Sequence, residues 1–445
     1  MSVSQFINKT VEFKFRGMVL HFDLSQGLFS SAGIDTGTKL LLKVFSRILD
    51  EDKAAGKFPP GSVLDAGCGI GVIGICAAKS GCVQVRCQDR DELARLFTIH
   101  NAAQNNIPLS ILDAFTEALL AGKGLLPAAA SSDTGGWDMI LSNIPAKAGK
   151  PVLEDFVRQS VQLLNPGGRV IIVAVNTLAD FFRKHIGIDA ELLQYEQGPG
   201  HKVFTFSRKQ QVKNECPQLP DNYNGSDNPP DFLTQNPSYF RTTVNAIIEE
   251  IPVQLETIHG ASGFDSPGTA VLNAAKLIKN ISLNHYPTDS DSPVLIHEPQ
   301  QGFFPCWLLT YIPQNRPVVL CGRNILELQA SRHNIASFHK GKITIVLAVD
   351  LHFNQDDLLN AACGMKFAFI AAFPDLLPAG SIPKGTDQLA VIWNSLPQLL
   401  SRNGLFLAAF SSSDAERFDR KKPSGFTRIG GIKRHGFRSL AYYYL

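Results

Sequence analysis

The sequence has no large excess of positive or negative charge. Its 445 residues carry 42 Lys plus Arg against 40 Asp plus Glu, a formal net charge of +2 at pH 7. This balance excludes a protein that attracts a polyanion by its bulk charge, so any contact with nucleic acid must come from a local patch.

The sequence also has few cysteines and no long apolar run. Its eight cysteines form no C-x-x-C pair, and the close pair Cys82 and Cys87 has no histidines at zinc-ligand spacing. We therefore expect reduced thiols and no metal. The first residues lack the pattern of a signal peptide, and no uncharged run reaches about 18 apolar residues. These absences predict a cytoplasmic protein without a membrane partner.

What the chain does have is enough apolar sequence for two domains. Hydrophobic residues make up 44% of the chain and charged residues 18%, which is too apolar for disorder. A Pro-, Asn- and Asp-rich stretch, residues 216–231, has no hydrophobic period and divides the chain almost in half. We predict one domain over residues 1–208, a linker over 209–235 and a second domain over 236–445.

Short β-branched runs alternate with helical patterns in the first half. Residues 62–65, 83–87, 137–141 and 169–173 are typical of buried strands, and residues 11–23 predict a hairpin around Gly17. Such alternation indicates an α/β fold with a largely parallel sheet covered on both faces.

The second half repeats the first. The segment SGFDSPGTAVL at residues 262–272 matches AGIDTGTKLL at residues 32–41, and three further pairs of short motifs follow at numbering differences between 229 and 236. Any two α/β domains share a strand–helix rhythm, but the paired motif and the nearly constant offset favour a tandem duplication of one fold.

A glycine loop follows the first strand of this alternation. Residues 63–74 read VLDAGCGIGVIG, in which Gly67, Gly69 and Gly71 would let a ligand approach the backbone at a helix N-terminus. The last six letters also fit the G-x-G-x-x-G fingerprint of dinucleotide-binding proteins. However, Asp65 ends the strand, and its carboxylate would repel a pyrophosphate. A cationic ligand such as S-adenosylmethionine suits the loop better.

Carboxylates follow three successive strands. Asp65 can serve the methionyl part of S-adenosylmethionine, Asp89 can accept both ribose hydroxyls, and Asp113 can bind the adenine amino group. In an open sheet, residues at the carboxyl ends of the strands converge on one crevice. The alternative for Asp89 and Asp113 is that they only cap the following helices.

The glycine loop, residues 27–42 before it and residues 138–145 after it resemble class I S-adenosylmethionine-dependent methyltransferases. More narrowly, they resemble the ribosomal RNA guanine-N2 methyltransferases, which have one active and one degenerate domain. The resemblance covers about residues 11–208. It implies tandem Rossmann-like domains, each with a seven-stranded, mostly parallel sheet whose last strand is antiparallel, and methylation of an exocyclic amine. It also implies that Asp35, Gly37 and Thr38 line the cofactor pocket.

The family's catalytic motif is Asn-Pro-Pro-aromatic, and this chain has Asn143, Ile144, Pro145 and Ala146 instead. In the family the Asn oxygen and the next carbonyl hold the amine so that its lone pair faces the methyl group. Asn143, Ile144 and Pro145 are therefore the predicted catalytic residues. The stacking ring is missing, and four phenylalanines could replace it, although each also suits an ordinary core: Phe29, Phe156, Phe181 and Phe182.

The second copy has lost the cofactor residues. At constant offset, Asp65 becomes Ile296, only Gly71 of the loop's first three glycines is kept, as Gly302, and Asn143 becomes Ala372. We expect this copy to be catalytically silent and to position the substrate. Its tail, residues 417–438, holds eight basic residues and one acidic one, a balance of 8 − 1 = +7, with interleaved aromatics. This mixture suits RNA, although a solvated hairpin would look the same. The RNA-binding candidates are Arg420, Lys421, Lys422, Lys433, Arg434 and Arg438.

These observations leave three hypotheses. The favoured one is an S-adenosylmethionine-dependent N-methyltransferase that modifies a guanine N2 amine of structured RNA, such as ribosomal RNA. The second is a retired enzyme that binds RNA, or assists assembly, and still holds the cofactor. The third is a methyltransferase for a protein glutamine amide, because that chemistry uses the same motif.

Overall fold

The computed structural model describes residues 3–121, 136–209, 231–281, 291–312, 315–378 and 387–445. They form two compact units, an N-terminal unit that includes the described residues up to 209 and a C-terminal unit that includes those of 231–376 and 387–445. Most of the predicted linker, residues 210–230, lies outside the described residues. The rest of it begins the C-terminal unit, where Asp231 caps a short helix, α6.

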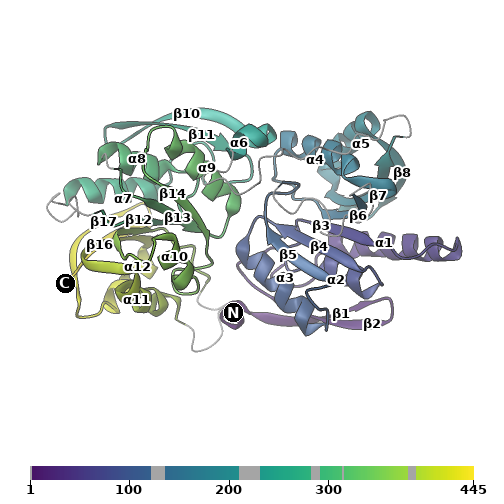
Figure 1. Cartoon of the computed structure of the whole chain (residues 1–445), viewed down its shortest axis with the longest axis horizontal. Helices are drawn as coiled ribbons and strands as arrows, with labels where there is room; N and C mark the ends of the chain where they lie inside the picture. Colours follow the sequence, from purple (N-terminus) through teal and green to yellow (C-terminus); the bar gives the residue numbers. More distant parts are fainter. Residues whose placement is uncertain (1–2, 122–135, 210–230, 282–290, 313–314, 379–386) are drawn as a thin grey trace. The chain divides into compact units, whose positions relative to one another are not determined.

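The N-terminal unit begins with a hairpin and continues as alternating strands and helices (Figure 1). Its strands are β1 (Lys9–Phe15), β2 (Met18–Leu24), β3 (Ser62–Ala66), β4 (Gln84–Asp89), β5 (Leu112–Thr116), β6 (Trp137–Asn143), β7 (Leu164–Val175), β8 (Ala190–Gln197) and β9 (His201–Arg208). Its helices are η1 (Ser4–Phe6), α1 (Thr36–Ala54), α2 (Val72–Lys79), α3 (Glu92–Gln104), α4 (Lys150–Gln162), η2 (Asn176–Leu178) and α5 (Ala179–Asp189).

The C-terminal unit repeats this order. Its strands are β10 (Phe240–Ile248), β11 (Ile251–Ile258), β12 (Val294–His297), β13 (Val318–Gly322), β14 (Ile343–Leu347), β15 (Phe367–Ala372), β16 (Leu400–Ser411), β17 (Phe426–Arg434) and β18 (Phe437–Tyr444). Its helices are α6 (Phe232–Gln235), η4 (Pro237–Tyr239), α7 (Thr269–Asn280), α8 (Phe303–Tyr311), α9 (Ile325–Ala336), α10 (Gln355–Ala361), α11 (Gln388–Leu399) and α12 (Ser412–Arg420).

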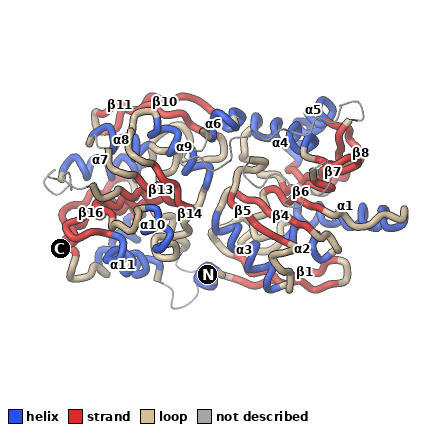
Figure 2. The backbone as a smooth tube through the Cα atoms, in the orientation of Figure 1, coloured by secondary structure: helices blue, strands red, loops and turns tan. Residues whose placement is uncertain are grey.

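Both units contain a seven-stranded sheet with the same topology. The strand order is β5-β4-β3-β6-β7-β9-β8 in the first and β14-β13-β12-β15-β16-β18-β17 in the second. Neighbours are parallel except that the last strand of the chain in each sheet, β9 or β18, runs antiparallel to both of its neighbours. In Figure 2 helices flank the red strands of each unit. The predicted α/β class with two methyltransferase-like sheets is confirmed.

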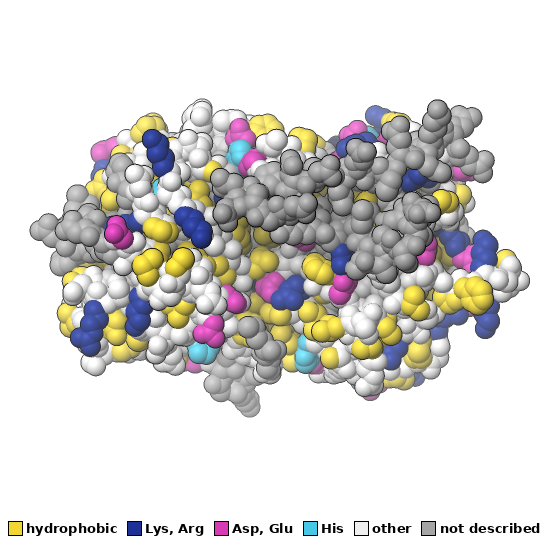
Figure 3. All heavy atoms as spheres, in the orientation of Figure 1, with side chains coloured by type: hydrophobic (Ala, Val, Ile, Leu, Met, Phe, Trp, Pro, Cys, Tyr) yellow, Lys and Arg dark blue, Asp and Glu magenta, His cyan; other side chains and the backbone are white. Residues whose placement is uncertain are grey.

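The central strands are buried on both faces, as expected when helices cover a parallel sheet. In β12, Val294 and Ile296 belong to one apolar cluster, while Leu295 between them belongs to another. On the face shown in Figure 3, acidic and basic side chains are interspersed, and dark blue ones gather near the exposed end of α1. This mixture fits the near-zero net charge.

The strand register fixes how the two copies correspond. Met139 of β6 lies opposite Arg169, the sixth residue of β7, and Phe369 of β15 lies opposite Leu405, the sixth residue of β16. Asn143 therefore corresponds to Phe373. The constant-offset comparison was one residue out in this strand.

An asparagine on the third helix ties each hairpin to its sheet. Asn101 accepts a hydrogen bond from the backbone N–H of Asp23 and donates to the carbonyls of Asp23 and Ile70. Asn334 makes the same bonds in the second copy, to Glu256 and to the carbonyl of Gln301. Because both asparagines are buried and bonded alike, the clamp is a shared structural element of the duplicated fold.

Candidate active site

Asp65 lies at the carboxyl edge of the first sheet and is fully buried. Its Oδ2 accepts a hydrogen bond of 2.9 Å from the N–H of Gly74, while Oδ1 has no hydrogen-bond partner among the described residues. Burial, with a smaller contribution from the negative charge of Asp89, raises the pKa of Asp65 to about 7. A buried carboxylate oxygen without a donor is suited to a cationic ligand.

The glycines of the loop serve two different purposes. Gly67, Gly69 and Gly71 all have positive φ angles, of 78°, 55° and 87°. A Cβ added to Gly69 would have no atom within 4 Å, so the loop leaves open space there. A Cβ on Gly71, however, would lie 2.9 Å from Thr98. Gly69 therefore borders open space, whereas Gly71 lets α3 pack closely against the loop.

Gly74 is a packing position, and its replacement gives a test. An added Cβ would lie 2.3 Å from Sγ of buried Cys87. We expect Gly74→Ala to destabilise the protein by about 1–3 kcal/mol, through overpacking. Removing the sulfur with Cys87→Ala should restore much of this loss, which thermal unfolding of the single and double variants would measure. Additive losses in the double variant would contradict the assignment, and Gly33→Ala, which meets no atom within 4 Å, is the control.

Asp89 ends β4 and faces the same loop. Its Oδ2 accepts from the N–H of Gly69 at 2.9 Å, and its Oδ1 accepts from the N–H of Asp91 at 3.1 Å. Burial and the nearby charge of Asp91 raise its pKa. The cap of α3 is Asp91, not Asp89, because Asp91 accepts from the N–H of Leu93. Asp89 therefore lies beside the glycine loop, as the sequence predicts.

The structure differs from the prediction at Asp113. This residue was expected after its strand, but it is the second residue of β5 and pairs in register with Arg86, three positions before the strand ends. Its carboxylate forms two hydrogen bonds with the Arg86 guanidinium, at 2.9 and 3.3 Å. The carboxylate that follows β5 is that of Glu117, whose N–H donates to the carbonyl of Asp89. Glu117 replaces Asp113 at this edge.

Asn143 ends β6 and is held by the start of α1. Its Nδ2 donates to Oδ2 of Asp35 and to Oγ1 of Thr38, both at 3.0 Å. The same Asp35 oxygen caps α1 by accepting from the N–H groups of Gly37, at 2.8 Å, and Thr38, at 3.2 Å. Since both amide hydrogens of Asn143 have acceptors, its Oδ1 points away from α1 and can accept from another group.

The residues after Asn143 lead out to the surface. Ile144 is 4% exposed and its N–H donates to the carbonyl of Val173, while Pro145 and Ala146 are exposed. No ring stands at Ala146. Of the four phenylalanines considered as substitutes, Phe156 and Phe182 are buried in the core and Phe181 packs on Phe182, whereas Phe29 is 73% exposed.

His201 is a site residue that the sequence reasoning missed. It opens β9, and a Cβ added to Gly37 would lie 3.0 Å from its Cδ2. Its Nδ1 is 3.5 Å from Oγ1 of Thr36. The contact arises because β9 runs antiparallel and begins at the carboxyl edge, opposite Val175. No local motif marks it, since the contact depends on the pairing of the last strand.

Comparisons with known proteins agree with this geometry. Residues 20–187 match the family model described as "Methyltransferase small domain". We refer to these residues as the methyltransferase small domain, after the model that they match. The ribosomal RNA small subunit methyltransferase C of Haemophilus influenzae is 33% identical over 174 residues, 38% of this chain and 46% of that protein. A ribosomal protein L11 methyltransferase of Thermosipho melanesiensis is 27% identical over 37% of this chain and 54% of that protein.

The chain thus spans about half the length of these curated relatives. Among solved structures, the T. thermophilus 16S rRNA N2 methyltransferase, solved in complex with AdoMet and guanosine, has a TM-score of 0.59. The match covers 99% of this chain and all of that one at 12% identity. At this identity the match shows the fold alone, and it extends beyond the methyltransferase small domain to both units.

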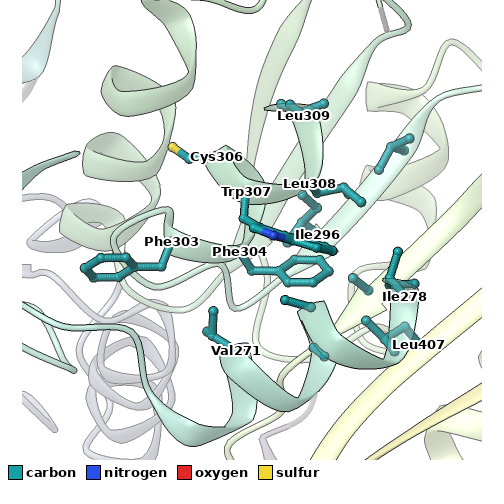
Figure 4. Close-up of a cluster of buried hydrophobic side chains, with 14 of the residues drawn as sticks. Val271, Ile278, Ile296, Phe303, Phe304, Cys306, Trp307, Leu308, Leu309 and Leu407 are labelled. Carbon is teal, nitrogen blue, oxygen red and sulfur yellow. The ribbon is translucent and has the colours of Figure 1, made fainter. Parts of the chain in front are cut away.

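The second copy keeps the backbone of the glycine loop but not its chemistry. Glu298, Gln300 and Gly302 stand where the first copy has Gly67, Gly69 and Gly71, with φ angles of 53°, 53° and 105°. Ile296, at the position of Asp65, lies among Phe304, Trp307 and other apolar side chains (Figure 4). Apolar packing replaces the carboxylate of the methyltransferase small domain.

The carboxylate of Asp89 has no direct counterpart either. β13 ends in Gly322 where β4 ends in Asp89, and an added Cβ there would lie 2.9 Å from Oε2 of Glu298. Buried Gln301 fills part of the loop by bonding the carbonyls of Ser262 and Phe264. Side chains of the C-terminal unit occupy the space that the methyltransferase small domain leaves open.

Half of the eight basic residues in the tail of the C-terminal unit are paired with acids. Ion pairs join Arg417 to Asp414, Lys421 to Asp387, Arg428 to Asp419 and Arg438 to Glu416, at 2.6–3.8 Å. Its aromatic residues lie mainly in the core, which favours the alternative of a hairpin whose apolar side packs in the sheet. Phe418, Phe426 and Tyr442 are buried and pack around Trp393, and only Phe437 is 40% exposed.

Among the described residues, no three His, Cys, Asp or Glu side chains come together as a metal site would require. No helix in the described ranges has the length and apolarity to cross a bilayer.

Proposed function

We propose that the methyltransferase small domain transfers a methyl group from S-adenosylmethionine to an exocyclic amine of structured RNA, with guanine N2 of ribosomal RNA as the target. The observation that carries the proposal is the orientation of Asn143. Its amide N–H groups are taken up by Asp35 and Thr38, so its oxygen is left for a substrate amine. The curated relatives named for ribosomal RNA methylation support the choice of target.

The residues of the first copy fit the cofactor. The orphaned Oδ1 of buried Asp65 suits its cationic methionyl part, the open space at Gly69 suits close approach to the backbone, and Asp89 would hold the ribose. When bound, the cofactor supplies an electrophilic methyl group on a sulfonium, and methyl transfer leaves a neutral thioether.

The chain's own contribution is to align the amine. The nitrogen lone pair of a guanine amine is delocalised into the ring, which makes it a weak nucleophile. Asn143 Oδ1 and the Ile144 carbonyl would accept its two N–H groups and favour a pyramidal nitrogen. The lone pair would then face the methyl group, and the amine would give up one proton as it is methylated. Alignment of this kind can supply most of the catalytic effect without a strong base.

The proposal is tested by tritium transfer from labelled cofactor to unmethylated ribosomal RNA and to ribosomal protein in parallel. Label in RNA, absent with Asn143→Ala, would support it. Label in protein would favour the glutamine-amide alternative. Cofactor binding without transfer to either would favour a retired enzyme, the hypothesis to which the missing ring at Ala146 points.

Thr38 gives a test of the amide orientation. Thr38→Val keeps the shape of this buried side chain but removes one acceptor of Asn143. Because a net hydrogen bond is worth about 0.5–1.5 kcal/mol, we expect kcat to fall about 3–10-fold with the KM for cofactor unchanged. Thr38→Ser should restore kcat. A loss of cofactor affinity in place of kcat would show that Thr38 serves the cofactor pocket instead.

A further inference from the structure

The carboxyl edge of the first sheet is divided by charge. The ends of β3, β4 and β5 carry the acids Asp65, Asp89, Asp91 and Glu117. The other side of the edge is built from residues 36–49, 143–153 and 197–203, which contain Lys and Arg but not one Asp or Glu. Acids flank these segments, but Asp35 bonds to Asn143, and Glu196 pairs with Lys43 and Arg47. The cations in excess on this side are therefore the remaining lysines.

The three acid-free segments meet around Asn143. Its amide bonds to the first turn of α1, and Gly37 of that turn lies against the ring of His201. The loop that starts α4 follows Asn143 directly, and Lys202 pairs in register with Ala174 near the end of β7, the neighbour of β6. The basic segments thus lie on the side of Asn143 away from the glycine loop.

Four lysines of these segments form what we term the lysine rim: Lys39, Lys147, Lys150 and Lys202. The first three are exposed, and Lys202 lies 5.7 Å from the centre of the Tyr195 ring. Within the described part of the chain no acidic side chain forms an ion pair with any of the four. The other two cations of α1 near this edge, Lys43 and Arg47, are both paired with Glu196, at 3.0 and 2.6 Å.

Unpaired cations next to a site for a cationic cofactor have an electrostatic cost, since like charges repel. A polyanion that enters from the basic side removes this cost and is attracted on approach. We infer that the lysine rim binds the phosphates that flank the target nucleotide, so that RNA is held by the methyltransferase small domain itself. The tail of the C-terminal unit is the weaker candidate because four of its eight cations are neutralised in ion pairs and most of its rings are buried, whereas all four lysines of the rim lack an acidic partner among the described residues. This inference rests on the proposed RNA substrate.

The test uses the full chain and in vitro transcribed, unmethylated small-subunit ribosomal RNA. Each phosphate contact contributes about 0.7–0.9 to the slope of log K against log salt. We expect Lys147→Ala/Lys150→Ala to raise the KM for this RNA about tenfold at 0.15 M salt and to lower the slope by about 1–2. The kcat at saturating RNA and the cofactor Kd should stay unchanged. The variant Lys147→Arg/Lys150→Arg keeps both charges and should have the wild-type slope.

Two controls make the outcome decisive. Lys43→Ala removes a cation that is already paired, and Arg420→Ala/Lys433→Ala removes two from the tail. If the wild type methylates the RNA and the rim variant does so with unchanged KM and slope, the inference is overturned while the proposed function stands. A larger effect of the tail variant would also overturn it. If the wild type transfers label to protein alone, the proposed RNA substrate itself fails.

Discussion

Replacing Asn143 by alanine is expected to lower kcat for methyl transfer by about 10²–10³-fold, the usual loss when one pre-oriented polar group is removed from a reacting centre. The variant loses the only side-chain oxygen that the structure directs away from Asp35 and Thr38 at the end of β6. Cofactor affinity should change little, since Asn143 lies outside the glycine loop. Single-turnover kinetics with saturating cofactor and RNA would measure the effect.

The matched control is Asn176→Ala, on the same edge of the sheet. Asn176 is exposed, and its amide donates to the carbonyl of Pro199, far from α1 in the sequence. We expect this variant to keep wild-type kcat. An Asn143→Ala variant that keeps more than half of the activity would rule out the proposed alignment of the amine, whatever the substrate.

Replacing Asp65 by asparagine is expected to weaken cofactor binding by at least about 30-fold. Removing one partner of a buried charge pair costs about 2–5 kcal/mol, and the amide keeps the size of the carboxylate. Isothermal titration of the full chain would measure the loss. Asp138→Asn is a control at the start of β6, because it removes a charge from the same sheet at the opposite edge.

The same variant separates a binding defect from a folding defect. Burial raises the pKa of Asp65 to about 7, so as pH rises from about 4 to 7 the unfolded chain loses this proton before the folded chain does. The free energy of unfolding therefore falls across that window, and above pH 7 the buried charge destabilises the apo-protein. Asparagine carries no charge, so at pH 8 the variant should unfold at the same or a higher temperature. Lower stability together with weak binding would contradict this account.

The sequence was sufficient for the fold and for the part of the site that is local in sequence. Asp65 and its glycines are adjacent residues, so strand, turn and helix start are all visible in one segment. The duplication was visible too, although the register moved the partner of Asn143 from Ala372 to Phe373. The prediction failed where a strand end had to be placed without a motif, as at Asp113.

Contacts between segments that are far apart in the sequence could not be predicted. The hydrogen bonds from Asn143 to Asp35 and Thr38 span more than 100 residues and depend on where α1 begins. The asparagine clamp did leave a signal, because the dipeptide His-Asn occurs at residues 100–101 and again at 333–334. The repeated dipeptide can be interpreted only from the structure, which shows the hydrogen bonds between each hairpin and its helix.

The altered glycine loop of the second copy has a consequence for the first. Glu298 and Gln300 adopt the left-handed backbone that Gly67 and Gly69 adopt, in spite of a penalty of about 1–2 kcal/mol for each side chain. The surrounding packing therefore dictates the turn, and glycine is dispensable for folding at these two positions. In the first copy, the absence of a side chain at Gly69 leaves open space beside the loop, and the proposed function assigns this space to the cofactor.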